Sequence, residues 1–111
     1  MGIIAALIPS TNPTSTTIYK IMISLKAGNA VIVSPHPNAK DSILKTAEYL
    51  IRAAERKGAP KGLIGVIKTP TLQATQELMK HKKTSLILAT GGEAMVKAAY
   101  SSGTPAIGVG P

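Results

Sequence analysis

Five short apolar segments without charged residues alternate along the chain with segments in which apolar residues recur every three or four positions. Uncharged runs of this length are typical of strands buried on both faces, and the second spacing is typical of amphipathic helices. The expected strands are residues 2–8, 30–33, 63–67, 86–89 and 106–109. The expected helices are residues 13–27, 38–57, 71–81 and 93–100.

This alternation predicts an α/β domain with a Rossmann-like parallel sheet of about five strands and helices on both faces. Right-handed crossovers return each strand to the same sheet, and the usual order 3-2-1-4-5 makes the first and fourth strands neighbours. The loops at their carboxyl ends, residues 9–13 and 90–92, are then expected to face each other across a crevice. Ligands bind at this position in such sheets. We expect the 111 residues to form a single domain.

The turn Thr90-Gly91-Gly92 lies between the fourth strand and the fourth helix. Glycines have no Cβ, so an anion such as a phosphate can approach the free backbone N–H groups and the positive end of the helix dipole. The same two glycines are equally expected in a plain tight turn. The stretch alone leaves both interpretations open.

The charge of the chain favours anionic partners. Lys and Arg number 13 against 5 Asp and Glu, for a net charge of +8. Nucleic acid is not expected as a partner, because the only aromatic residues are three scattered tyrosines and the basic residues form no arm. Solvated helix faces account for charge spread so evenly, and phosphorylated small molecules such as dinucleotides or coenzyme A would also be attracted.

Several kinds of chemistry are absent from the sequence. The chain has no cysteine, which excludes disulfides, thiolate metal sites and a cysteine nucleophile. His36 and His81 have no carboxylate and nucleophile at triad-like spacing, and no metal site is expected. No apolar run approaches the roughly 20 residues that span a bilayer, and no signal peptide is recognisable. A cytoplasmic protein without membrane contact is therefore expected.

The ordinary dinucleotide fingerprint is also missing. The loop after the first strand, residues 9–13, is Pro-Ser-Thr-Asn-Pro instead of Gly-x-Gly-x-x-Gly, and the second strand ends without an acidic residue for a ribose hydroxyl. Gly108-Val109-Gly110 is only half a fingerprint. A bound nucleotide would need another contact scheme.

Four segments, residues 9–16, 34–37, 89–92 and 98–110, together resemble the coenzyme-A-acylating aldehyde dehydrogenases, including the aldehyde dehydrogenase half of bifunctional aldehyde–alcohol dehydrogenases. The resemblance covers the whole chain but only part of the cofactor-binding domain of such an enzyme. It implies an aldehyde substrate, NAD as cofactor with NADP not excluded, coenzyme A as co-substrate, and a homo-oligomer. In the intact enzyme a cysteine attacks the aldehyde, hydride passes to NAD, and the thioester is transferred to coenzyme A.

The same resemblance assigns roles to individual residues. Asn12 matches the asparagine that donates to the oxyanion, although it is also placed to cap the helix that begins at Pro13. Hydrolytic relatives have Lys and Glu at the positions of Ser34 and Pro37, in the loop that holds the adenosine ribose, so the choice between NAD and NADP stays open. The matched cofactor-binding residues are Ser34, Pro35, His36, Pro37, Thr90, Gly91, Gly92, Gly108 and Val109.

Gly108 stands where hydrolytic relatives have a glutamate that activates water, so its presence would spare the thioester for coenzyme A. The alternative is a glycine required for close backbone packing. The family's nucleophilic cysteine is absent, and the chain is expected to be inactive alone. A stand-alone module that binds a phosphorylated ligand without catalysis is the other interpretation of the sequence.

Overall fold

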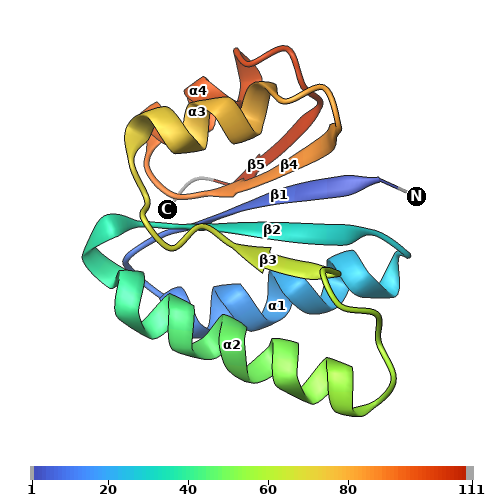
Figure 1. Ribbon diagram of the computed structural model, residues 1–111. Coiled ribbons are helices and arrows are strands. Elements are labelled where there is room, and N and C mark those ends of the chain that lie inside the picture. Colours follow the sequence, from blue (N-terminus) through green and yellow to red (C-terminus); the bar gives the residue numbers. More distant parts are fainter. Residues whose placement is uncertain (1, 110–111) are drawn as a thin grey trace.

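A central sheet of five parallel strands runs through the computed structural model, which describes residues 2–109 (Figure 1). The sheet order is β3-β2-β1-β4-β5, which confirms the predicted fold class and strand order. The strands are β1 (Ile3–Ile8), β2 (Ala30–Pro35), β3 (Ile64–Val66), β4 (Thr84–Thr90) and β5 (Ala106–Val109). The helices are α1 (Pro13–Lys26), α2 (Lys40–Arg56), α3 (Leu72–Lys80) and α4 (Glu93–Tyr100), with a short 3₁₀ turn η1 (Pro37–Ala39).

The two faces of the sheet are covered by different helices. In Figure 1, α1 and α2 lie below the sheet and α3 and α4 lie above it. Side chains of β1 alternate between the two faces, with Ile4, Ala6 and Ile8 facing the α1–α2 side. Ala5 and Leu7 belong to the cluster on the α3–α4 side. This burial of both faces explains why the strands carry no charge.

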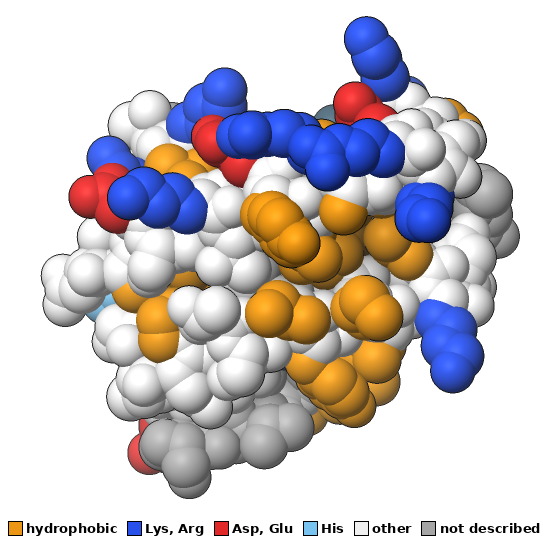
Figure 2. Space-filling view, turned by 90° about the horizontal axis from the view of Figure 1, so that it is seen from below, with side chains coloured by type: hydrophobic (Ala, Val, Ile, Leu, Met, Phe, Trp, Pro, Cys, Tyr) orange, Lys and Arg blue, Asp and Glu red, His pale blue; other side chains and the backbone are white. Residues whose placement is uncertain are grey.

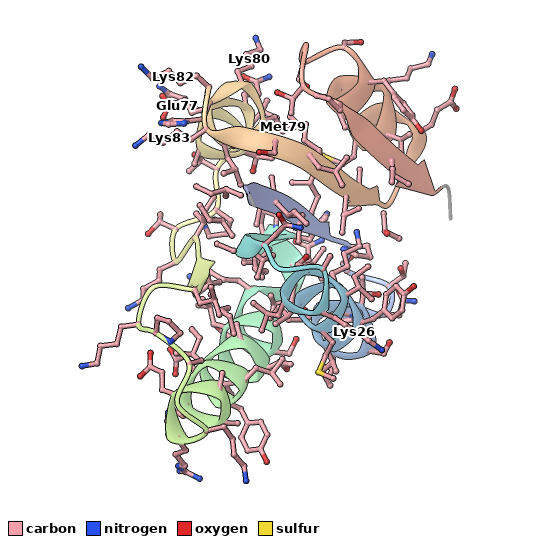
Figure 3. The ribbon with its side chains drawn as sticks, turned by 90° about the vertical axis from the view of Figure 1, so that its right-hand side faces the viewer. Lys26, Glu77, Met79, Lys80, Lys82 and Lys83 are labelled. Atoms are coloured by element: carbon pink, nitrogen blue, oxygen red, sulfur yellow. The ribbon has the colours of Figure 1, made fainter. Side chains whose placement is uncertain are left out.

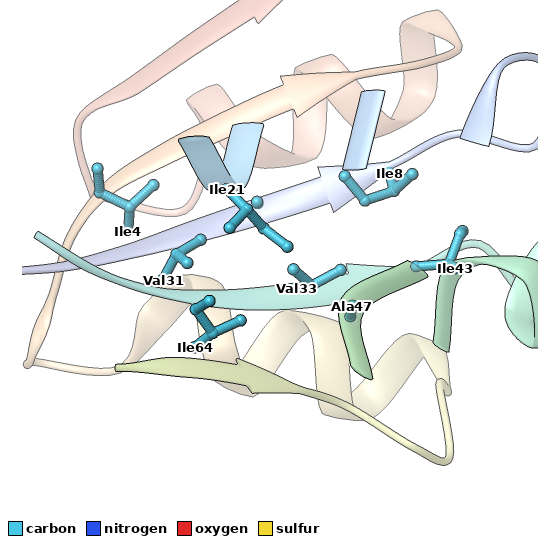
Figure 4. Packing of buried hydrophobic residues seen from close by; sticks show 9 residues of the cluster. Ile4, Ile8, Ile21, Val31, Val33, Ile43, Ala47 and Ile64 are labelled. Carbon is cyan, nitrogen blue, oxygen red and sulfur yellow. The ribbon is translucent and has the colours of Figure 1, made fainter. Parts of the chain in front are cut away.

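The larger core lies between the sheet and the α1–α2 layer (Figure 4). It consists of nine buried apolar residues, namely Ile4, Ala6, Ile8, Ile21, Val31, Val33, Ile43, Ala47 and Ile64. Val31, Val33 and Ile64 come from the short edge of the sheet, where β2 and β3 pair. The core therefore holds this half of the sheet rigidly beneath the loops that follow β1 and β2.

The two prolines of residues 34–37 predict an extended loop, because proline disfavours both a helix and strand pairing, and the structure differs from that prediction. Pro35 is the last residue of β2 and pairs with Ile8, whereas Pro37 begins η1. Alternate residues of β2 bond to β3, as Val31 and Val33 do, and β3 has already ended beside Pro35. The last β2–β3 pair is Val33 with Val66, so the pairing with β3 does not call for a backbone N–H at position 35 and proline fits there.

The underside of β4 and β5 is covered by fewer residues than the rest of the sheet. Ile107 is 55% exposed, and it lines one cavity together with Tyr19 of α1, which is 64% exposed. Figure 2 shows hydrophobic side chains gathered in the middle of this face, with Lys and Arg side chains along one margin. An apolar surface on this side is thus open to solvent in the chain.

Basic side chains at the α3–β4 junction project away from the core. Lys80, Lys82 and Lys83 point outward, while Met79 beside them points toward the sheet (Figure 3). Met79 is buried and the three lysines are exposed. They precede β4, so they lie at the opposite end of the sheet from its carboxyl edge. This cluster is a solvated surface, as we expected for most of the charge.

Two further features concern sites and membranes. Among residues 2–109, no three His or acidic side chains lie close enough together to hold a metal ion. Over the same residues, no helix combines the length and apolar character that crossing a bilayer requires.

Candidate functional site

A cavity of about 820 Å³ opens at the carboxyl edge of the sheet. Four segments contribute its walls: the loop after β1, the end of β2 with η1, the segment that leads into α3, and the turn between β4 and α4. The loops of residues 9–12 and 90–92 line the same cavity, as the strand order predicts. Eight of the sequence-predicted residues line it, namely Asn12, Ser34, Pro35, His36, Pro37, Thr90, Gly91 and Gly92.

The turn from β4 into α4 lines this cavity through Thr90, Gly91 and Gly92. Gly91 has a φ of 151°, a conformation that side-chain-bearing residues rarely adopt, and Gly92 occupies the N-cap position. The N–H groups of Glu93 and Ala94 begin the helix and have no intrahelical acceptor. Glu93 is exposed and its carboxylate pairs with Lys97 at 3.6 Å. The turn can therefore receive an anion at the positive end of α4.

Asn12 occupies the N-cap position of α1, but its side chain makes no capping hydrogen bond. The prediction that this side chain caps the helix is therefore wrong. Its Oδ1 instead accepts a hydrogen bond from Thr11 Oγ1 at 3.2 Å. The helix begins at Pro13, which has no N–H to satisfy at this position. The Asn12 amide is exposed at the cavity, so it is placed to donate toward a ligand.

The end of β2 builds the opposite wall. Ser34 is only 4% exposed, and its Oγ lies 2.9 Å from Thr75 Oγ1 of α3 in a buried hydrogen bond. His36 Nδ1 accepts from the backbone N–H of Asn38 at 3.0 Å, which leaves Nε2 as its outward polar atom. None of the residues that line the cavity is Asp or Glu. The side chain of Ser34 thus ties β2 to α3, and no carboxylate is present for a ribose hydroxyl.

Gly108 lies outside the cavity lining and packs against α4. A Cβ at this position would lie 2.6 Å from Val96 Cγ1 and 3.2 Å from Tyr100 Cε2. The backbone N–H of Gly108 donates to the Tyr100 hydroxyl at 3.0 Å. The geometry favours the close-packing interpretation of this glycine. Val109 of β5 pairs with Thr90 of β4, and the structure does not describe the side chain of Val109.

The segment that follows β3 contributes to the cavity, although no motif in the sequence predicted it. Pro70, Thr71, Leu72 and Thr75 line the cavity. Thr71 is the N-cap of α3, where its Oγ1 accepts from the Ala74 N–H at 3.0 Å. The helical spacing of Leu72, Thr75 and Met79 predicts that all three point inward, but Leu72 is 71% exposed. Topology offered a signal, because this segment also follows the carboxyl end of a strand that neighbours β2.

Comparison with known proteins identifies the family. A model of the aldehyde dehydrogenase family matches residues 1–107. The chain belongs to the aldehyde dehydrogenase family. The chain is 58% identical over 110 residues to the bifunctional aldehyde-alcohol dehydrogenase AdhE of Escherichia coli (strain K12), covering 99% of this chain and 12% of that protein. The resemblance to acylating members of the aldehyde dehydrogenases is thereby confirmed.

Solved aldehyde dehydrogenase structures agree closely with the fold. A probable aldehyde dehydrogenase from Listeria monocytogenes EGD-e has a TM-score of 0.96 at 65% identity, over 99% of this chain and 24% of that one. An acetylating aldehyde dehydrogenase from Geobacillus thermoglucosidasius has a TM-score of 0.97 at 62% identity, with the same two coverages. The chain therefore spans about a quarter of these enzymes and a smaller share of AdhE.

Two aldehyde dehydrogenase relatives were solved with bound ligands. An engineered glycolyl-CoA reductase holds NADP⁺ and has a TM-score of 0.94 at 38% identity, over 98% of this chain and 25% of that one. A propionaldehyde dehydrogenase from Rhodopseudomonas palustris holds propionyl-CoA and has a TM-score of 0.91 at 40% identity, over 98% and 24%. Nicotinamide nucleotides and coenzyme A are thus ligands of solved members of this family.

Proposed function

We propose that the chain forms the nucleotide-binding part of a coenzyme-A-acylating aldehyde dehydrogenase and that its cavity receives NAD or NADP. The observation that carries this proposal is the turn of residues 90–92, which presents the N-terminus of α4 to the cavity. The pyrophosphate is the part of the nucleotide that this turn would hold. The ligands of the solved relatives support the same assignment.

The other walls suit the remaining parts of the nucleotide. Pro35, Pro37 and Leu72 give the cavity an apolar side against which an adenine ring can pack. His36 lies between the two prolines in the sequence. Its Nε2 is the ring nitrogen that could contact a ligand, since Nδ1 accepts a hydrogen bond from the Asn38 N–H. Without a carboxylate in the lining, discrimination against a ribose 2′-phosphate has no evident source. The pyrophosphate is therefore the main anchor, and the choice between NAD and NADP stays open.

In the whole enzyme, the proposed reaction converts an aldehyde, coenzyme A and NAD to an acyl-coenzyme A and NADH. This chain contributes Asn12, whose amide would donate to the oxyanion that forms when a thiolate attacks the aldehyde carbon. The nucleophile must come from another part of the enzyme, because these 111 residues contain no cysteine. The bound nicotinamide would accept the hydride. We expect no dehydrogenase activity from the chain alone.

Calorimetry with ADP and adenosine tests the anchor. ADP should bind the chain clearly more tightly than adenosine, since only ADP reaches the turn with charged phosphates. Gly91→Ala should weaken ADP binding, because alanine is strained at a φ of 151°. Gly103→Ala is the matched control, since Gly103 also has a positive φ of 91° but lies away from the cavity. Equal affinities for ADP and adenosine would refute the proposal and favour a module with another ligand.

A further inference from the structure

Lys20 is a buried cation on the side of α1 that faces the sheet. Its side chain is 5% exposed, and its Nζ donates to the backbone carbonyls of Leu7 and Leu88, each at 2.9 Å. The ion pairs of the described residues, Glu48–Arg52 and Glu93–Lys97, do not involve it. An apolar side chain of similar length would fill the same space without burying a charge. The lysine therefore has a role that packing alone does not explain.

The two carbonyls belong to neighbouring strands at the point where those strands separate. Leu7 of β1 pairs with Ala89 of β4, which is the residue that follows Leu88. Beyond this pair, β1 leads down to α1 and β4 leads up to α4, which opens the crevice between them (Figure 1). Leu7 is two residues before Pro9, and Leu88 is two residues before Thr90. One amine thus bridges the bases of both loops that form the proposed phosphate site.

A second cavity, of about 600 Å³, lies on the α1 side of the sheet, and both Lys20 and Thr90 line it. It is lined by residues of α1, including Tyr19 and Lys20, together with Leu88, Thr90 and Ile107. Thr90 lines both this cavity and the nucleotide cavity. The environment of Lys20 and the anion-binding turn therefore share a residue as well as a strand.

We propose that Lys20 is a positioning residue whose protonated amine fixes the separation of the β1 and β4 loops and so sets the geometry of the nucleotide site. The claim about the nucleotide site rests on the proposed function, whereas the claim about the separation of the two loops does not. An ammonium group has three N–H donors, and two of them hold the two carbonyls. Loss of the proton would replace these bonds with weaker neutral ones and remove a positive charge beneath the site for an anion.

Lys20 is suited to change its charge near neutral pH, because burial lowers its pKa to about 8. The described residues of β1, β2, β4 and β5 around it include no titratable side chain. On α1, Tyr19 lines the same cavity and Lys26 is exposed at the end of the helix. The charged residues of α2, which packs against α1, are all outside the buried core: Lys40, Asp41, Lys45, Glu48, Arg52, Glu55 and Arg56.

Nuclear magnetic resonance of the labelled chain without ligand tests the coupling directly. Between pH 7 and 9.5, the ¹³Cε signal of Lys20 and the amide signals of residues 10–12 and 90–92 should change with one common midpoint. Lys20→Met should abolish this change in the loops. Lys26→Met, the same substitution at an exposed lysine of the same helix, should leave it intact. Loop signals that do not follow Lys20, or that still titrate in Lys20→Met, would overturn the proposal.

NAD affinity supplies the functional readout, since the NAD pyrophosphate does not titrate in this range. Affinity should fall about fivefold from pH 7 to 9 in the unsubstituted chain, because charge-assisted hydrogen bonds are roughly twice as strong as neutral ones. It should be independent of pH in Lys20→Met. A chain whose loops titrate but which binds no NAD would refute the proposed function and leave the positioning role standing. If Lys20→Met fails to fold, the common midpoint in the unsubstituted chain decides the question.

Discussion

Replacing Gly108 with alanine measures how closely α4 packs on β5. The new methyl group would lie 2.6 Å from Val96 Cγ1, a distance that real Cβ contacts do not show, so α4 or Val96 must move. The φ of Gly108 is not positive, so the substitution adds no backbone strain. Overpacking of this kind typically costs about 1–3 kcal/mol. In a domain of this size we expect Tm to fall by about 4 °C or more.

A double-mutant cycle with Val96→Ala assigns the cost to this contact. Urea unfolding would give the free energy of unfolding for the unsubstituted chain, Gly108→Ala, Val96→Ala and the double variant. Val96→Ala removes the methyl group that clashes, so Gly108→Ala should cost little in that background. The coupling between the two sites should reach about 1 kcal/mol or more, as is usual for residues in contact. A neutral Gly108→Ala, or a cost unchanged by Val96→Ala, would refute the packing argument.

The result also decides how the missing general base can be tested. A glutamate at position 108 would begin by pointing at α4, so in the whole enzyme it should be introduced together with Val96→Ala. If loss of a base is what spares the thioester, this variant should raise the ratio of free acid to acyl-coenzyme A at fixed coenzyme A. General-base assistance is typically worth about 10²–10⁴-fold, so a poorly placed carboxylate should still change the ratio. An active variant with an unchanged ratio would mean that something else prevents hydrolysis.

Three further predictions concern stability and association. Ser34→Ala should lower the free energy of unfolding, measured by urea titration, by about 1–3 kcal/mol, because it leaves the buried Thr75 hydroxyl without its partner. Adding Thr75→Val removes that hydroxyl and should restore part of the loss. The folded-state pKa of Lys20 lies below its usual value of 10.5, so the unfolded chain binds more protons between pH 8 and 10.5. The free energy of unfolding should therefore rise across that window by up to about 3 kcal/mol. If the free energy of unfolding changes with pH equally in Lys20→Met and in the unsubstituted chain, this prediction is contradicted. The exposed apolar face of α1 and β5 should make the chain self-associate, and Ile107→Lys should reduce the mass seen in sedimentation equilibrium; a monodisperse monomer at high concentration would contradict the expectation.

The sequence was sufficient to predict the sheet order and the position of the crevice, because uncharged strands and short loops leave few topologies. It misjudged Pro35, since whether a proline fits in a strand depends on where the neighbouring strand ends. It also misjudged Leu72, since a single turn of helix can expose one apolar residue at the rim of a cavity. Local patterns carry no information about such neighbours.

Side-chain roles were harder to predict than positions. Ser34 lines the cavity as expected, yet its hydroxyl is directed to Thr75, a residue 41 positions away in the chain. The importance of Lys20 was invisible, because a lysine on an amphipathic helix ordinarily lies at the solvent edge. Only the approach of two strand carbonyls distinguishes it from Lys26 on the same helix.

The pairing of β1 with β4 has a consequence for the order in which the chain can fold. Ile3 pairs with Ala30 on one side and with Thr84 on the other, so the two edges of β1 are completed by segments at very different sequence separations. The half that contains β1, β2, β3, α1 and α2 can close through nearer contacts and carries the larger core. Closing the longer loop costs more chain entropy and is slower. The nucleotide cavity, which needs both halves, should therefore be the last part of the molecule to form.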